Sequence, residues 1–146
     1  MVRPFHLAIP VTDLESARKF YGDVFGCNQG RSSDLWIDWD FFGHQLVTHV
    51  SPKEVHIVPS NIVDKHKSPC RHFGIVLEWD EWHNLVKKLE AHQLEYISKP
   101  HTRFKGLAGE QATLMICDLS LNAIEFKAFK DDSDRFFPPS IILMSF

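Results

Sequence analysis

Two histidines and one glutamate, residue types that bind transition metals, lie in similar short stretches of sequence. His6, His72 and Glu125 each lie in a short alternating segment, opposite a row of apolar residues. Two imidazoles and one carboxylate are the smallest set that holds a divalent metal ion and leaves positions open for water, substrate or dioxygen. No single short motif joins the three, and a lone histidine in a strand is more often structural than a ligand.

The first histidine lies in a segment with the period of a strand. Residues 4–9 place Phe5, Leu7 and Ile9 on one face and His6 on the other, which predicts a half-buried strand. Thr12 and Glu15 then have the spacing of a capping box, which predicts an amphipathic helix of about three turns. Gly26 is placed to end that helix.

The second histidine begins a weaker copy of the same pattern. The stretch RHFGIVLEW again sets a histidine opposite an apolar row, and Asp80 is placed to cap a second helix. The fragments HLAI and HFGI therefore predict two half-modules, joined by a loop over residues 51–69. Glu125 lies in the strand-like segment AIEFKAF, opposite Ile124 and Phe126.

Composition restricts the class of protein. A chain of 146 residues with 44% hydrophobic residues fits one domain, and a net charge of -3 argues against nucleic-acid binding. No apolar run approaches the roughly 18 residues that would span a membrane, and no signal-peptide core is visible, so we expect a cytoplasmic protein. Cys27, Cys70 and Cys117 are odd in number and widely spaced, which predicts buried, reduced thiols.

Three stretches of the chain resemble the vicinal oxygen chelate superfamily, which includes glyoxalases, extradiol dioxygenases, and fosfomycin and bleomycin resistance proteins. They are HLAIPVTDLESARKFYGDVFG, HFGIVL and CDLSLNAIEFKAF. The resemblance implies an α+β fold of two βαβββ modules, at about 4–50 and 70–129, within one domain over residues 1–130. The modules would form an open, mixed β-sheet cup with helices packed outside. Residues 131–146 form a tail whose apolar end, SIILMSF, indicates a homodimer.

The resemblance also implies a ligand set. It assigns His6, His72 and Glu125 to one divalent metal ion, with Fe(II) favoured and Ni, Zn or Mn as alternatives. Gln45 is a fourth ligand or a hydrogen-bond partner of the substrate, and His44 and His49 are nearby alternatives.

Several reactions remain compatible with such a site. Dioxygenase-type chemistry on a small chelated substrate is slightly favoured, with Glu125, His49 and Arg103 in catalytic roles. The extradiol enzymes carry a Tyr and a His before the closing turn, whereas this chain has LMIC there, which argues against catechol cleavage.

The first alternative is a glyoxalase-type lyase or isomerase with Ni or Zn, in which Glu125 moves the proton. A fosfomycin-type transferase lacks a basic cluster beyond Arg71, Arg103 and Lys105. The second alternative is a metal-free binding protein for small drug-like molecules. A substrate or ligand pocket would be lined by Trp36, Trp39, Phe42, His101 and Phe104.

Overall fold

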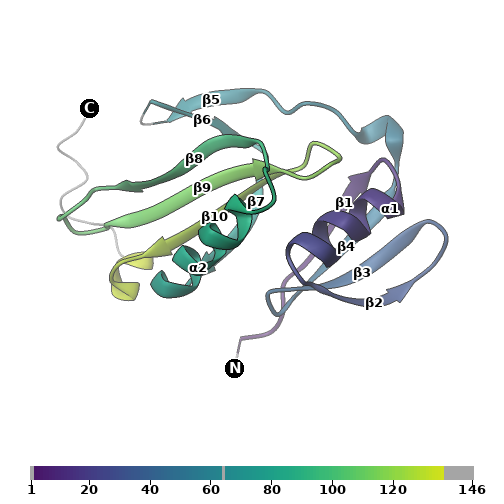
Figure 1. Ribbon diagram of the computed structural model, residues 1–146, viewed down its shortest axis with the longest axis horizontal. Helices are drawn as coiled ribbons and strands as arrows, with labels where there is room; N and C mark the ends of the chain where they lie inside the picture. The colour runs from purple at the N-terminus through teal and green to yellow at the C-terminus, as the bar shows by residue number, and fades with distance from the viewer. Residues whose placement is uncertain (1, 64, 137–146) are drawn as a thin grey trace. The chain divides into compact units, whose positions relative to one another are not determined.

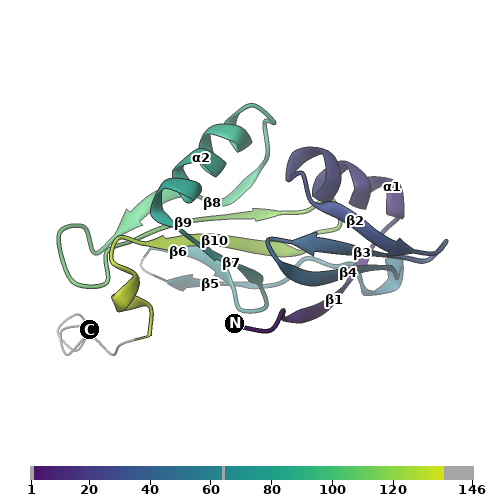
Figure 2. The same ribbon diagram turned by 90° about the horizontal axis from the view of Figure 1, so that it is seen from below.

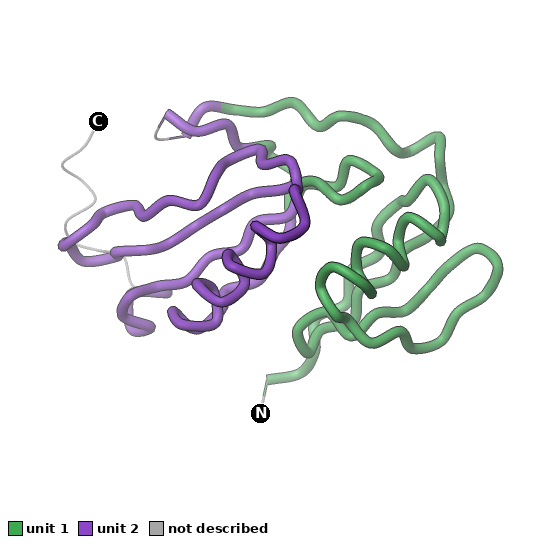
Figure 3. The backbone as a smooth tube through the Cα atoms, in the orientation of Figure 1, with its two compact units in different colours: residues 1–61, 69–72, 117–123 green, residues 62–68, 73–116, 124–146 purple. Residues whose placement is uncertain are grey.

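The computed structural model describes residues 2–63 and 65–136 of the chain (Figure 1). It divides into two compact units (Figure 3), which comprise residues 1–61, 69–72 and 117–123, and residues 62–68, 73–116 and 124–146. Each contains a mixed four-stranded sheet and a helical segment, so the α+β class with paired βαβββ modules is confirmed. No helix in the described part of the chain has the length and apolar character needed to cross a membrane.

The first sheet has the strand order β1-β4-β3-β2. Its strands are β1 (His6–Val11), β2 (Asn28–Ser32), β3 (Trp36–Phe41) and β4 (His44–Val50). The first strand of the module pairs in parallel with the last, and the β2–β3 and β3–β4 pairs are antiparallel. This pairing brings the N-terminal histidine strand beside the strand that carries Gln45.

One face of this sheet forms the core beneath the helix (Figure 2). Ile9, Val11 and Leu46 of the sheet are buried, and so are Phe20 and Tyr21 of the helical segment. The predicted alternation is therefore confirmed for Ile9. Phe5 is 65% exposed and does not belong to the core, because it lies before the first residue of β1.

The first helix consists of α1 (Leu14–Ala17) and a π-helical continuation, Arg18–Val24. Its cap is Asp13 and not Thr12: Oδ1 of Asp13 accepts from the backbone N–H of Ser16 at 2.7 Å. The N–H of Thr12 instead donates to Oγ of Ser120 at 2.9 Å. Gly26 has φ +72°, so the predicted left-handed end of the helix is confirmed.

The second sheet has the strand order β7-β10-β9-β8. Its strands are β7 (Phe73–Leu77), β8 (Tyr96–Arg103), β9 (Gln111–Cys117) and β10 (Ala123–Phe129). Helix α2 (Trp79–Glu90) lies on one face of this sheet (Figure 2). Its cap is Glu78, in a capping box with Glu81, and not the predicted Asp80.

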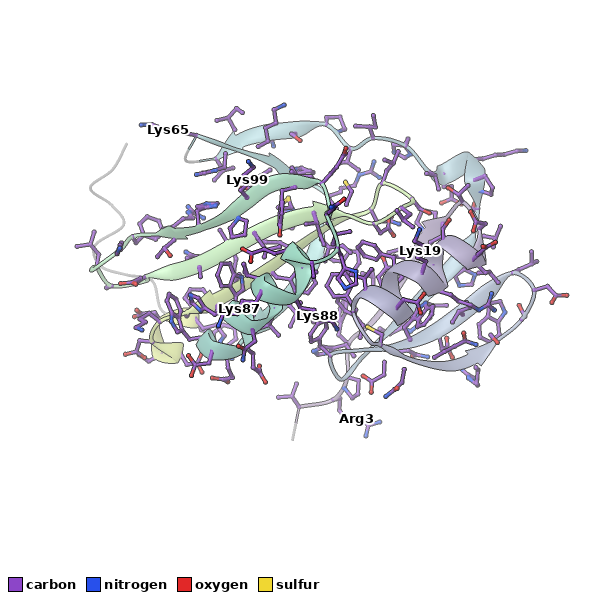
Figure 4. All side chains as sticks on the ribbon, viewed as in Figure 1. Arg3, Lys19, Lys65, Lys87, Lys88 and Lys99 are labelled. Carbon is purple, nitrogen blue, oxygen red and sulfur yellow. The ribbon has the colours of Figure 1, made fainter. Side chains whose placement is uncertain are left out.

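Helix α2 buries a stripe of apolar side chains on its sheet. Trp82, Leu85 and Leu89 are buried, and the indole N–H of Trp82 donates to the carbonyl of Phe126 at 2.8 Å. Lys87 and Lys88 lie on the exposed side of the helix, as Figure 4 shows. This helix therefore covers the face of the sheet that is opposite Glu125, because Phe126 and Glu125 alternate along β10.

The connection between the modules contains regular structure that the sequence did not predict. After a 3₁₀ turn (Pro52–Glu54), the strands β5 (Ser60–Val63) and β6 (His66–Pro69) form a hairpin, so the expectation of a loop over 51–69 is wrong. Residues 60–63 of β5 are all exposed, and an exposed strand has no apolar alternation by which it could be recognised.

None of the three cysteines is buried: Cys70 is exposed, and Cys27 and Cys117 are partly exposed. The expectation of buried thiols was wrong. A 3₁₀ turn, Asp132–Arg135, follows β10, whereas SIILMSF lies outside the described residues.

Candidate metal centre and adjoining cavity

His6 and Gln45, two of the expected ligands, lie side by side in the first unit. His6 is the first residue of β1 and is the register partner of Gln45 in β4. Nδ1 of His6 donates to Oε1 of Gln45 at 2.9 Å. Because the amide oxygen can only accept, Nδ1 carries the proton, and Nε2 is the nitrogen that carries the lone pair a metal would use.

His72 has the same tautomer by a different contact. It lies directly before β7 rather than inside the strand, and its Nδ1 donates to the carbonyl oxygen of Pro69 at 2.5 Å. A carbonyl oxygen can only accept, so Nε2 again carries the lone pair. Both histidines are exposed residues of the first unit, and each has its ring oriented by an oxygen atom.

Glu125 lies on β10 in the second unit and is held by two donors. Oγ1 of Thr113 donates to Oε1 of Glu125 at 2.7 Å, and Nζ of Lys127 lies 3.4 Å from the same oxygen. The Glu125 side chain is 18% exposed, so the carboxylate is partly shielded from water. Hydrogen bonds of this kind orient a carboxylate before it binds a cation.

The strand opposite Glu125 comes unusually close. Gly74 of β7 is the register partner of Glu125, and a Cβ atom at Gly74 would lie 1.6 Å from the carbonyl oxygen of Glu125. Position 74 therefore requires glycine, because any side chain would push β10 away from β7.

The second unit contains a cavity of about 40 Å³ beside Glu125. Its lining comes from the β5–β6 hairpin and from strands β8, β9 and β10: Val63, His66, Lys67, Ser68, Ser98, His101, Arg103, Thr113, Met115 and Glu125. Three residues that the sequence analysis singled out, His101, Arg103 and Glu125, thus line one cavity.

The other lining residues were missed, for identifiable reasons. His66, Lys67 and Ser68 belong to the unpredicted hairpin. In a regular strand, Ser98 and His101 would point to opposite faces of the sheet, because they are an odd number of residues apart. Both line the cavity because the register of β8 shifts between them. The alternation of QATLMIC, which places Thr113 and Met115 on one face, was the available signal for those two residues.

Two histidines stack in this cavity. The rings of His66 and His101 are parallel within 11° and their centroids are 3.7 Å apart. Nδ1 of His101 donates to the carbonyl oxygen of Lys99 at 2.7 Å, and Nδ1 of His66 lies 3.4 Å from Oγ of Ser98. The stacked pair therefore has a fixed orientation.

The aromatic residues of the expected pocket are dispersed. In the first unit, Trp39 is 2% exposed and donates its indole N–H to Oγ1 of Thr48, so it lies in the core under the helix. Trp36 faces Arg31, whose guanidinium lies 6.0 Å from the ring, and Phe42 is 39% exposed in a turn. These positions do not form a stacking pocket within the first unit.

The remaining candidates have separate settings. His49 is exposed on β4, and Nδ1 of His44 accepts from the backbone N–H of Phe5 at 3.0 Å. In the second unit, Phe104 follows β8 with φ +53°, and its ring lies 4.9 Å from the guanidinium of Arg103. The Phe104 ring thus packs beside a cavity-lining cation.

The turn DLSLN, part of the motif that carried the family resemblance, has a structural role. Asp118 is buried and accepts from the hydroxyl of Tyr21 at 2.8 Å and from the backbone N–H groups of Ser120 and Asn122. The Asn122 side chain donates to the carbonyl of Pro10 at 2.8 Å. Burial raises the pKa of Asp118, although its hydrogen bonds partly offset this effect.

The candidate ligands are divided between the units. His6, Gln45 and His72 belong to the first unit and Glu125 to the second. Among residues 2–63 and 65–136, no three His, Cys, Asp or Glu side chains form a group that could hold a metal. The donor set itself, two imidazoles with Nε2 lone pairs and one oriented carboxylate, suits a borderline divalent ion such as Fe(II), Ni(II) or Zn(II).

Comparison with known proteins identifies the family. Residues 3–126 match the Glyoxalase/Bleomycin resistance protein/Dioxygenase superfamily. The chain belongs to this superfamily, most of whose members are enzymes. No protein of curated function matches the chain by sequence.

Solved structures support the same assignment. A glyoxalase/bleomycin resistance protein/dioxygenase from Alicyclobacillus acidocaldarius is 36% identical, with a TM-score of 0.74, over 91% of this chain and 96% of that one. The fosfomycin resistance protein FosX from Listeria monocytogenes is 15% identical, with a TM-score of 0.69, over 92% and 98%. A lactoylglutathione lyase from Agrobacterium tumefaciens is 17% identical, with a TM-score of 0.62, over 88% and 92%. The last two likenesses concern the fold alone.

Proposed function

We propose that the chain is an enzyme that uses one divalent metal ion, held by His6, His72 and Glu125, in dioxygenase-type chemistry on a small substrate. The observation that carries the proposal is the hydrogen bond from Nδ1 of His6 to Oε1 of Gln45. The Gln45 oxygen is occupied by the imidazole, so Gln45 acts as an orienting partner and not as a fourth ligand. The protein then supplies three ligands and leaves positions for substrate and dioxygen.

The pseudo-symmetry of the modules supports this ligand set. In the first module, His6 on the first strand faces Gln45 on the last strand. In the second module, Glu125 on the last strand faces Gly74, two residues beyond His72 and on the same side of the chain as His72. The proposed ligands, and Gln45 as the partner of His6, thus lie on or directly before the parallel first and last strands of each module.

The protein's own residues have distinct proposed roles. A bound Fe(II) ion would supply the site for a chelating substrate and for dioxygen. Thr113 and Lys127 hold the Glu125 carboxylate in position, and Arg103 orients the substrate from the cavity wall. His49 remains a candidate for proton transfer, since it lies on β4 with Gln45, on the same side of that strand.

Glyoxalase-type chemistry with Ni or Zn is the second candidate function. It is favoured by the position of Gln45, which is near enough to His6 to share a metal if its oxygen turns away from the imidazole. A four-ligand site would then support Lewis-acid catalysis, with Glu125 moving the proton. The partner in either reaction is a small molecule, and a homodimer remains expected.

Metal analysis of protein purified without chelator tests the site. We expect one equivalent of divalent metal in the wild type, its loss in His72→Ala, and its retention in the control His92→Ala, since His92 is exposed beyond α2. Unchanged metal content in His72→Ala would overturn the ligand assignment.

Two activity assays then separate the reactions. Oxygen consumption by the Fe(II)-loaded protein with candidate chelating substrates supports dioxygenase chemistry. Isomerisation of a hemithioacetal by the Ni-loaded protein, without oxygen consumption, would replace it with the glyoxalase reading.

A further inference from the structure

The turn at residues 118–122, which leads from β9 into β10, is fastened to the end of β1. Nδ2 of Asn122 donates to the carbonyl oxygen of Pro10 at 2.8 Å, and the backbone N–H of Thr12 donates to Oγ of Ser120 at 2.9 Å. These bonds join positions that are 112 and 108 residues apart in the chain, within the first unit. They are therefore tertiary contacts, and a turn of this kind does not need them for its own geometry.

The Asn122 amide also closes the turn. Its Nδ2 donates to Oδ2 of Asp118 at 2.8 Å, while Oδ1 of Asp118 accepts from the backbone N–H groups of Ser120 and Asn122, each at 2.8 Å. A side-chain amide has two N–H groups, so Asn122 gives one to the turn and one to β1. The amide thus has one orientation, and it ties the turn directly to the strand.

The turn holds one residue in an unfavourable backbone conformation. Leu121 has φ +66°, in the left-handed region that favours glycine over residues with a side chain. Its side chain is 39% exposed, so burial of apolar surface does not account for this conformation. Such strain persists where the surrounding contacts determine the backbone, and it concentrates at functional sites. Here those contacts are the hydrogen bonds of Asp118, Ser120 and Asn122.

The turn is close along the chain to a proposed metal ligand. Glu125 is three residues beyond Asn122, a reach of about 10 Å at most. The two residues between them, Ala123 and Ile124, are 4% and 0% exposed, so this short link is packed in place. The strand at the other end of the Asn122 bond carries His6 as its first residue. A change in this one bond therefore acts on the segment that leads into Glu125.

We propose that Asn122 is a positioning residue of the metal centre, whose amide holds the segment leading into Glu125 on the strand that carries His6. The inference rests on the proposed function, because it takes His6 and Glu125 as ligands of one metal ion. Asn122 does not touch the ion and acts through the backbone of β10. The strain at Leu121 is then the cost of holding the turn in this place.

Metal affinity of the full-length protein, measured by competition with a chromophoric chelator, tests this role. Asn122→Ala should lower the affinity about tenfold or more, as expected when a group that orients a ligand is lost. Tyr21→Phe is the matched control, because the Tyr21 hydroxyl donates to the same oxygen of Asp118 at 2.8 Å and has no second O–H to give. It should lower the urea midpoint of unfolding and leave metal affinity unchanged. An equal loss of metal affinity in both variants would overturn the proposal, since Asn122 would then only stabilise the fold.

A second pair of variants separates positioning from stability. Leu121→Gly should raise the urea midpoint, because the relief of strain at positive φ exceeds the entropy that glycine adds to the unfolded chain. In the double variant Leu121→Gly/Asn122→Ala, we expect the urea midpoint to recover toward the wild-type value while metal affinity stays low. Recovery of metal affinity together with stability would contradict a positioning role.

NMR of the metal-free protein gives a readout that does not depend on the metal. Asn122→Ala should shift the backbone and carboxyl signals of Glu125, whereas Tyr21→Phe should shift them much less. Unchanged Glu125 signals in Asn122→Ala would overturn the proposal. A wild-type protein that binds no metal would overturn the proposed function, and the Glu125 signals alone would then decide whether Asn122 positions that residue.

Discussion

The ring of His6 and the amide of Gln45 are joined across the parallel β1–β4 pair by a hydrogen bond of 2.9 Å from Nδ1 to Oε1. This contact settles the tautomer of an imidazole whose other nitrogen is the proposed metal ligand. The sequence left open whether Gln45 is a fourth ligand, and this contact supports the proposal that Gln45 orients His6 instead.

We predict that Gln45→Ala lowers metal affinity about 10- to 100-fold, the effect typical of losing a partner that orients a ligand. Stoichiometric binding should persist at high metal concentration, whereas His6→Ala should abolish it. Competition titration with a chromophoric chelator measures both. Abolition of binding by Gln45→Ala, to the same extent as by His6→Ala, would make Gln45 a ligand and favour the glyoxalase-type site.

Thr113→Val is expected to lower metal affinity about tenfold or more by releasing Oε1 of Glu125. The change keeps the shape of a side chain that is 6% exposed, and should cost about 0.5–1.5 kcal/mol of unfolding free energy, typical of one hydrogen bond. Thr48→Val is the matched control, because Thr48 is also buried and hydrogen-bonded, to Trp39 in the first unit. Thr48→Val should lower the free energy of unfolding by a similar amount and leave metal affinity unchanged. An equal loss of metal affinity in both variants would argue that Thr113 does not act by orienting Glu125.

Period-two alternation was the part of the sequence that carried the most structural information. It placed His6 and Glu125 opposite buried rows, and the structure agrees, because a half-buried strand must alternate whatever its neighbours are. The faces of β1 and β10 were therefore predictable. His72 was placed one residue too far inside its strand, because alternation does not define where a strand begins.

The helix cap could not be predicted, because the free energies of the two candidate caps are too similar to distinguish from sequence. Thr12 and Asp13 are both good caps and adjacent, and the competing bond from Thr12 to Ser120 is visible only in three dimensions. The cavity could not be predicted from the sequence. Its lining depends on the hairpin that contributes His66 and on the register shift by which both Ser98 and His101 face the same space. Neither leaves a periodic trace.

Gly74→Ala tests the close approach of β7 and β10. A Cβ atom there would lie 1.6 Å from the Glu125 carbonyl, so we expect a loss of about 1–3 kcal/mol or more in unfolding free energy, the usual cost of overpacking. Metal affinity should fall as well, because the strand that carries Glu125 must shift. Chemical denaturation and metal titration measure the two effects.

Gly30→Ala is the control for that substitution. Gly30 also lies in a strand, but the nearest atom to its Cβ position is Cβ of Asp38 at 3.5 Å, an ordinary contact. It should change stability little. Equal losses for Gly74→Ala and Gly30→Ala would attribute the effect to strand glycines in general.

Asp118 should make stability fall as pH rises. Burial raises its pKa above the usual value of 3.8, so the folded state holds the proton more tightly than the unfolded state does. The protonated Asp118 therefore contributes fully to the free energy of unfolding below pH 3.8, and this contribution is lost as the pH rises through the folded-state pKa. Relative to Asp118→Asn, the wild type should therefore lose unfolding free energy as pH increases from about 4 through that value. Urea denaturation across this range, with NMR titration of the carboxyl, measures the slope.

Asp13 provides a control of opposite sign. Hydrogen bonds from the backbone and hydroxyl of Ser16 lower the pKa of Asp13, so its contribution is present above 3.8 and is lost as pH falls through the folded-state value. The wild type should lose unfolding free energy below about pH 4, and Asp13→Asn should not show this loss. Above about pH 4, where the Asp118 effect lies, Asp13→Asn should leave the pH dependence of stability unchanged. If Asp118→Asn and the wild type show parallel pH profiles above pH 4, burial does not perturb Asp118, and its network with Tyr21 and Asn122 stabilises the carboxylate as fully as water does.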